Sequence, residues 1–247
     1  MEIIPVIDLL DGRVVRGVGG RREDYQPVRS CLCPSADPFV VLRAFHESLH
    51  LQSCYVADLD ALQGRGLNRC VLAELSRFPV RLMVDRGPRG IDEVGELFDL
   101  GAHAAIVALE SLPGTDFALK LIQSFGPEKL VLSLDLKNGS LMTELPEFQQ
   151  QSPLELAIQL LELGYTRMIV LDLAAVGMAT GPASLELCQA IHVHAPAIEL
   201  ISGGGVRTVD DLSVMRDAGL NGALIASALH DGTIGPEDLS RLKQDSV

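Results

Sequence analysis

Tryptophan is absent from this sequence, and aromatic residues make up only 4% of its 247 positions. Hydrophobic residues nevertheless reach 47% and charged residues 21%, so an aliphatic core is available and the composition is that of a folded protein. No stretch has the composition of a linker. We therefore expect one compact domain over residues 1–247, a length that a large α/β barrel commonly fills.

Basic residues are also scarce. Lys and Arg number 20 against 33 Asp and Glu, and the resulting net charge of −13 argues against a nucleic-acid partner. No apolar run is long enough to span a bilayer, and the first residues lack the basic region of a signal peptide. We expect a cytoplasmic protein without a membrane partner. An anionic substrate would need local positive features to overcome the negative field.

Signatures of metal sites are missing or misplaced. The five cysteines are scattered, and one residue separates Cys31 from Cys33, too few for a zinc knuckle. The segment 46–50 matches the H-E-x-x-H pattern of zinc enzymes, but it falls in the helix expected after the first strand, away from the catalytic face of a barrel. We expect reduced thiols, no metal and no cofactor.

Short apolar runs alternate with segments of helical periodicity, which is typical of β-α units in a parallel sheet. The helical segments include Pro38–His50, Ile91–Leu100, Pro153–Leu163 and Val209–Ala218. The predicted strands are Ile3–Asp8, Cys54–Asp58, Val80–Val84, Ala104–Ala108, Leu130–Asp135, Met168–Asp172, Ile198–Ser202 and Gly222–Ala226. Eight strands in this length predict a (β/α)8 TIM barrel. A doubly wound sheet would need a glycine fingerprint after the first strand, and none is present.

The chain contains an internal repeat of about half its length. Residues 7–14 resemble residues 134–141, and in both copies an apolar run ends in an aspartate four residues before a glycine. Weaker pairs follow: 56–59 with 170–173, and 89–94 with 207–212. The offset drifts from 127 to 114 to 118, as loop insertions would produce. The barrel is therefore predicted to consist of two similar halves.

The sharpest motif is the glycine-rich turn at residues 202–208, after the seventh predicted strand and before a helix. Its glycines let backbone N–H groups surround an anion, and the helix N-terminus adds its positive end. Barrels usually bind phosphate here. Small residues and a hydroxyl at the end of the eighth strand leave room for the same group. The candidate phosphate-binding residues are Gly203, Gly204, Gly205, Arg207, Ala226 and Ser227. A packing role for the glycines is the alternative.

Two aspartates are the candidate catalytic pair. Asp8 and Asp135 end the first and fifth predicted strands, on opposite walls of the barrel mouth, so a substrate between them could lose a proton to one and gain a proton from the other. Strand-end aspartates also cap loops. We expect that capping or orienting role for Asp58, Asp60 and Asp172, and side-chain caps from Asp11 and Asn138 in the two copies of the repeat.

These residues together resemble the histidine-biosynthesis barrel family, the HisA isomerases and HisF cyclases. The resemblance covers essentially the whole chain and is carried by residues 4–16, 56–61, 134–139, 181–182 and 202–207. It implies an Amadori rearrangement of an aldose to a ketose, in which Asp8 removes the C2 proton and Asp135 protonates the ring oxygen. It also adds Arg16 and Asp172 to the candidate substrate-binding residues. The inserted segment 19–28 is similar to a related group found alongside methanopterin-type one-carbon metabolism.

The chain departs from the family pattern after the fifth strand, at the sixth strand and, in the first half, at the second phosphate site. The family binds a second phosphate with a glycine-rich turn after the third strand, where this chain has Asp85 and Arg86, and Glu110 follows the fourth strand. A carboxylate about 4 Å from a phosphate charge costs on the order of 1 kcal/mol in water and about 4 kcal/mol at a near-surface dielectric. The second site should be weak or lost unless Arg86 and Arg89 compensate.

The leading hypothesis is a divergent HisA-like isomerase acting on a phosphorylated small molecule. Three alternatives stay open: the phosphoribosylformimino-aminoimidazole carboxamide ribotide isomerase of histidine biosynthesis itself, a HisF-like cyclase subunit with a glutaminase-type partner and an open path through the barrel, and a non-catalytic sensor of phosphometabolites. The sequence leaves the substrate, the pathway and the formation of a homo-oligomer open.

Overall fold

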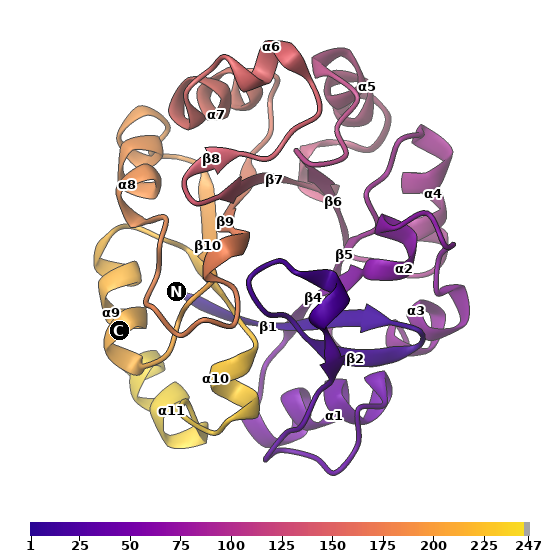
Figure 1. Cartoon of the computed structure of the whole chain (residues 1–247), viewed down its shortest axis with the longest axis vertical. Coiled ribbons are helices and arrows are strands. Elements are labelled where there is room, and N and C mark those ends of the chain that lie inside the picture. The colour runs from indigo at the N-terminus through magenta and orange to yellow at the C-terminus, as the bar shows by residue number, and fades with distance from the viewer. Residues whose placement is uncertain (245–247) are drawn as a thin grey trace.

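The alternation of apolar runs with helical segments folds into a closed ring of eight parallel strands surrounded by helices (Figure 1). The structure is a computed structural model that describes residues 1–244. The barrel strands are β1 (Glu2–Leu10), β4 (Ser53–Asp58), β5 (Arg81–Asp85), β6 (Ala104–Ala108), β7 (Leu130–Lys137), β9 (Arg167–Asp172), β10 (Glu199–Gly203) and β11 (Gly222–Ile225). Because β11 pairs with β1, the ring closes, and the predicted TIM barrel is confirmed.

Helices and short extra strands connect the barrel strands. The helices are α1 (Pro38–Leu49), α2 (Leu59–Leu62), α3 (Arg69–Leu75), α4 (Ile91–Asp99), α5 (Thr115–Phe125), α6 (Pro146–Gln149), α7 (Pro153–Leu161), α8 (Leu185–His194), α9 (Val209–Asp217), α10 (Ser227–His230) and α11 (Pro236–Gln244). The short elements are β2 (Arg13–Arg16), β3 (Gln26–Pro27), β8 (Ser140–Leu141) and the 3-10 turns η1 (Arg22–Asp24), η2 (Pro127–Lys129) and η3 (Leu173–Ala175). No helix of residues 1–244 is long and apolar enough to cross a bilayer.

The two halves repeat at the level of strand register. Met83 on β5 lies opposite Ala104 on β6, and Ile201 on β10 lies opposite Gly222 on β11, so both partners are displaced by 118 positions. The β1–β4 pairing likewise returns in β7–β9, with offsets of 127 and 114. Side chains 118 positions apart on these strands therefore occupy equivalent places, which confirms the predicted internal repeat.

Each half also carries the same β-hairpin beside the barrel mouth. Asp11-Gly12 joins β1 to β2 and Asn138-Gly139 joins β7 to β8, and all four residues have positive φ, between 49° and 75°. Asp-Gly and Asn-Gly are favoured in such turns because both residues must adopt left-handed conformations. The prediction that Asp11 and Asn138 act as side-chain caps is wrong.

Aspartates that follow the neighbouring strand hold these hairpins in place. The backbone N–H of Asp11 donates to Asp60 over 2.8 Å, and that of Asn138 donates to Asp172 over 3.0 Å. Asp58 accepts from the backbone N–H groups of Ala61 and Asn68. The predicted capping role of Asp58, Asp60 and Asp172 is thus confirmed.

Aliphatic side chains fill the inside of the barrel below the mouth. Ile4, Ile106, Val131, Ile169 and Ile201 come from five different strands, and each is at most 1% exposed. The open path along the barrel axis that the cyclase interpretation predicts is occupied by this layer. The barrel is a packed core with its chemistry at one end.

The H-E-x-x-H segment lies in α1, in the outer ring (Figure 1). His50 has left-handed backbone geometry, with φ of 55°, and ends the helix, while His46 Nδ1 lies 3.1 Å from the Leu51 carbonyl oxygen. The two rings therefore do not share a helical face.

Candidate active site

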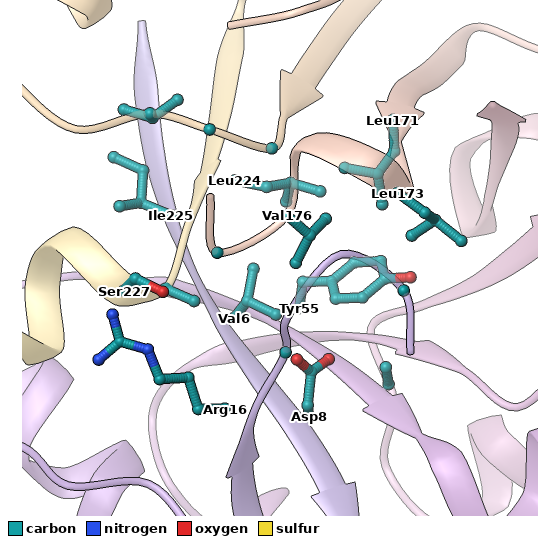
Figure 2. Close-up of a pocket in the computed structure, with 18 of the residues that line it drawn as sticks. Val6, Asp8, Arg16, Tyr55, Leu171, Leu173, Val176, Leu224, Ile225 and Ser227 are labelled. Carbon is teal, nitrogen blue, oxygen red and sulfur yellow. The ribbon is translucent and has the colours of Figure 1, made fainter. Parts of the chain in front are cut away.

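A cavity of about 310 Å³ opens at the carboxyl ends of the barrel strands. Its walls are largely aliphatic, with Leu171, Leu173, Val176 and Leu224 around the opening drawn in Figure 2. The segment between β2 and β3, which contains η1, crosses over the mouth (Figure 1). Both halves contribute to the lining, and both candidate catalytic aspartates reach it.

Asp8, near the end of β1, points into this cavity beside Tyr55 (Figure 2). Its carboxylate has no hydrogen-bond partner among residues 1–244. Burial raises the pKa of Asp8 to about 7, and the nearby Arg22 charge offsets part of that effect. A carboxylate with such a pKa exists in both protonation states near neutral pH, as proton transfer requires.

Asp135 reaches the same cavity from β7 and is 6% exposed. One oxygen accepts from the Ser133 hydroxyl over 2.8 Å, and the other accepts from the Glu110 backbone N–H over 3.4 Å. Burial raises the pKa of Asp135 to about 7, and the neighbouring Asp85 charge contributes to the rise. The paired carboxylates predicted from the repeat are therefore brought to one cavity, with similar proton affinities.

The glycine turn between β10 and α9 forms another part of the wall. Gly204, Gly205 and Arg207 line the cavity with Ala226 and Ser227, while Gly203 does not. A Cβ on Gly203 would lie 2.7 Å from the Leu224 Cβ, so this glycine is needed for close packing. Gly205 has φ of 82°, and a Cβ there would lie 2.2 Å from the Gly181 carbonyl oxygen.

Backbone donors in this turn are free. In the part of the chain that the structure describes, the N–H groups of Gly205 and Val206 have no acceptor, and the Ser227 hydroxyl lies on the same cavity wall. Thr208 begins α9 with a capping box to Asp211, so the helix N-terminus is well formed at this position. Free N–H groups, a hydroxyl and a helix N-terminus together suit an anion.

The two remaining candidates differ in their access to the cavity. Arg16 lines it, but both of its terminal nitrogens bind Asp231, over 2.7 and 2.6 Å. Asp172 does not line it, because its oxygens accept backbone N–H groups of Asn138, Gly139 and Ala174. Asp172 thus positions the hairpin beside Asp135.

The equivalent turn of the first half has lost its donors. Gly87 corresponds to Gly205, and its N–H is bound over 3.0 Å by the carboxylate of Asp85, from the same turn. Pro88 corresponds to Val206 and has no N–H. An internal carboxylate and a proline therefore replace the two free donors of the second half.

The residues that follow the adjoining strand β6 also lack the hydroxyl donor of the second half and add a carboxylate. At the offset of 118, Leu109 replaces Ser227 and Glu110 replaces Ala228. Glu110 lines the cavity and pairs over 2.9 Å with Arg22, which comes from the segment above the mouth. The predicted weakness of this site therefore has a structural basis.

The two arginines of this turn have different surroundings. Arg86 turns toward α4, where it pairs with Glu96 over 2.6 Å and is only 11% exposed. Arg89 lies outside the 310 Å³ cavity and lines a separate hollow with Gly87 and Glu110. Its backbone N–H donates to Glu93, as that of Arg207 donates to Asp211.

Sequence reasoning missed Arg22, Tyr25 and Tyr55, all of which line the cavity. The Tyr55 hydroxyl donates to Asp85 over 3.0 Å, deep in the barrel mouth. Tyr55 stands in an apolar run, where a core role is the ordinary interpretation. Arg22 lies in a charged insertion without periodicity, and only the path of the chain shows that it meets Glu110.

Comparison with known proteins identifies relatives along the whole chain. The model of the histidine biosynthesis protein family matches residues 2–235. A 1-(5-phosphoribosyl)-5-((5-phosphoribosylamino)methylideneamino)imidazole-4-carboxamide isomerase of Syntrophomonas wolfei is 31% identical over 247 residues, 98% of each chain. The enzyme of the same name from Listeria welshimeri is 31% identical over 246 residues, again 98% of each chain. An uncharacterized protein of Methanocaldococcus jannaschii is 31% identical over 242 residues, 97% of each chain.

Proposed function

This chain belongs to the histidine biosynthesis protein family, and we propose that it catalyses an Amadori-type aldose–ketose isomerisation of a singly phosphorylated metabolite. The observation that carries this proposal is the asymmetry of the cavity. Two carboxylates of matched pKa face it from β1 and β7, and the turn after β10 offers the free N–H groups of Gly205 and Val206, whereas the matching Gly87 N–H is bound by Asp85 and Pro88 has none.

The roles of the two aspartates follow from their surroundings. Asp8, whose pKa the Arg22 charge lowers in part, is the base that removes the C2 proton of the substrate. Asp135 is the acid that gives a proton to the ring oxygen as the ring opens, because the adjacent Asp85 charge favours its protonated form. The proton gained by Asp8 is balanced by the one lost from Asp135. The resulting enol becomes the ketose by losing its hydroxyl proton while C1 gains one, so no external redox reagent is needed.

Substrate phosphate binds at Gly205 and Val206 in this proposal, with Ser227 as a further donor. This places the phosphate on the second-half wall and the reacting carbons between the aspartates. The Asp8→Asn variant keeps the shape of the side chain and removes the base. It should bind inorganic phosphate as the unaltered protein does and lose turnover of any substrate found. Unchanged turnover would rule out the mechanism.

A second candidate is the reaction named for the two isomerase relatives, which the identity of 31% over nearly the whole chain favours. That substrate carries two phosphoribosyl groups. Complementation of a histidine auxotroph tests this candidate: growth would support it, and failure by well-expressed protein would count against it. We expect failure, because Asp85, Pro88 and Glu110 oppose a second phosphate.

A further inference from the structure

The cavity has two chemically different ends. On the second-half wall lie the free N–H groups of Gly205 and Val206 and the Ser227 hydroxyl. On the first-half wall lie the carboxylates of Asp85 and Glu110. Asp8 on β1 and Asp135 on β7 also line the cavity and add to the negative charge, and Asp135 adjoins the first-half end, where it accepts from the Glu110 backbone N–H. A ligand that fits both ends must itself be dipolar.

The first-half end is short of positive partners. Among residues 1–244, Asp85 accepts only from neutral donors, the Tyr55 hydroxyl and the Gly87 N–H. Within the same residues, Asp135 accepts only from the Ser133 hydroxyl and the Glu110 backbone N–H. Arg22 reaches this end and pairs with Glu110. The other two arginines of the lining are Arg16, already bound to Asp231, and Arg207, beside the glycine turn.

The raised pKa of Asp85 agrees with this shortage of cationic partners. Burial raises the pKa of Asp85 to about 6, and the Glu110 charge adds to the rise while Arg22 only partly offsets it. Buried carboxylates that face a cavity without a matching cation are stabilised by a ligand that brings one. The same carboxylates repel a second phosphate, so they also exclude doubly phosphorylated competitors.

We propose that the substrate is an amino monophosphate, whose phosphate binds at the Gly205 turn and whose cationic nitrogen group binds against Asp85 and Glu110. This rests on the proposed function, since it assumes the phosphate end of the same cavity. The nitrogen group is an ammonium or an amidinium, which presents several N–H donors to two carboxylates. The catalytic aspartates then face the carbon chain between the two ends.

Four synthetic probes with the same five-carbon chain test the proposal by calorimetry on the intact protein. They are pentyl phosphate, 5-hydroxypentyl phosphate, 5-aminopentyl phosphate and pentane-1,5-diyl bisphosphate. The expected order of affinity is amine, then alcohol, then bisphosphate. The amine should bind at least about 30-fold more tightly than the alcohol, because its ammonium group forms a desolvated charge pair with the carboxylates of Asp85 and Glu110.

Charge-removing variants locate the effect. Asp85→Asn and Glu110→Gln should each reduce the preference for the amine over the alcohol by at least about tenfold and leave pentyl phosphate affinity unchanged. Asp92→Asn, an exposed carboxylate at the start of α4, removes the same charge outside the cavity and should change nothing. Circular dichroism and thermal melting check that each variant is folded.

The outcomes separate the two proposals. If pentyl phosphate binds and the amine gains nothing, or the bisphosphate binds best, the amino-monophosphate proposal is overturned and the phosphate site stands. An amine preference that survives both Asp85→Asn and Glu110→Gln also overturns it. If none of the four probes binds, the phosphate end is wrong and both proposals fail together.

Discussion

The turn after β10 and the turn after β5 occupy equivalent places in the two halves of the barrel, with strand registers that match at an offset of 118. In the first-half turn, the donor of Gly87 is bound internally and the donor at Pro88 is absent, whereas the matching N–H groups at Gly205 and Val206 are free. After the adjoining strand β6, Glu110 stands where the second half has Ala228. A repeat can thus keep its backbone while one copy exchanges hydrogen-bond donors for carboxylates.

The candidate catalytic aspartates show the opposite pattern, because each half has one in an equivalent hairpin. Asp8→Asn and Asp135→Asn should each lower kcat, by about 10²- to 10⁴-fold, as expected for loss of a general acid or base. The double variant should lose little more, since turnover needs both ring opening and C2 proton removal and the slower of the two limits the rate. Steady-state kinetics on the identified substrate checks this. If the activation free energies lost in the two single variants simply added up in the double variant, the paired role of the two aspartates would be contradicted.

A single substitution can introduce the carboxylate of Glu110 at the matching position of the second half. Ala228→Glu places the carboxylate of Glu110 at the matching second-half position, about 4 Å from a bound phosphate if the repeat holds. Phosphate affinity should fall about 10³-fold, from a repulsion of about 4 kcal/mol at a near-surface dielectric. Ala228→Gln has the same size without the charge and serves as the control. Equal losses in both variants would point to crowding instead of charge.

The buried carboxylate of Asp85 should make the free energy of unfolding depend on pH. Burial raises the pKa of Asp85 to about 6 in the folded protein, from an ordinary value of 3.8. Between about pH 4 and pH 6 the native state holds more protons than the unfolded state, so the free energy of unfolding falls as pH rises. The contribution of Asp85 is about 3 kcal/mol at most.

Chemical denaturation across this pH range checks the sign. Asp85→Asn should make the fall less steep, leaving the part due to Asp8 and Asp135, whose pKa values are also raised, and should stabilise the protein at pH 7.5. The exposed Asp92→Asn variant should leave the curve unchanged. A steeper fall in Asp85→Asn would contradict the assignment.

The smallest expected effect concerns the hydroxyl of the second half. Ser227→Ala should weaken phosphate binding about tenfold, the loss of one hydrogen bond to a charged group. Ser111, on the first-half side, lies outside the 310 Å³ cavity, so Ser111→Ala should have no effect on phosphate. Calorimetric titration with inorganic phosphate compares the two variants. A loss of phosphate affinity in Ser111→Ala would indicate a phosphate bound on the first-half side, against the account.

The fold was predictable because the pattern is strong: eight apolar runs alternate with helical segments, and two halves repeat. Predicted strand boundaries such as Val80–Val84 fall one residue from the observed β5, Arg81–Asp85. The conflict at Asp85 and Glu110 could also be predicted, since acidic residues stood where the resemblance requires glycine or a hydroxyl. Pro88 was missed, although a proline in an anion-binding turn signals a lost donor.

Other features depend on tertiary placement and could not be predicted from local pattern. The ion pair of Arg22 with Glu110 joins residues 88 positions apart. Arg86 was a plausible phosphate ligand until the structure placed it against α4. The same holds for Tyr55, whose hydroxyl reaches Asp85 from within a run of core residues.

The position of bound anions tests the central claim most directly. A crystal structure of the protein grown with inorganic phosphate should show one phosphate at the carboxyl end of β10, held by the N–H groups of Gly205 and Val206, and none at the Asp85–Gly87 turn. Phosphate at both turns, or at the Asp85–Gly87 turn alone, would contradict the asymmetric cavity on which the proposed function is built.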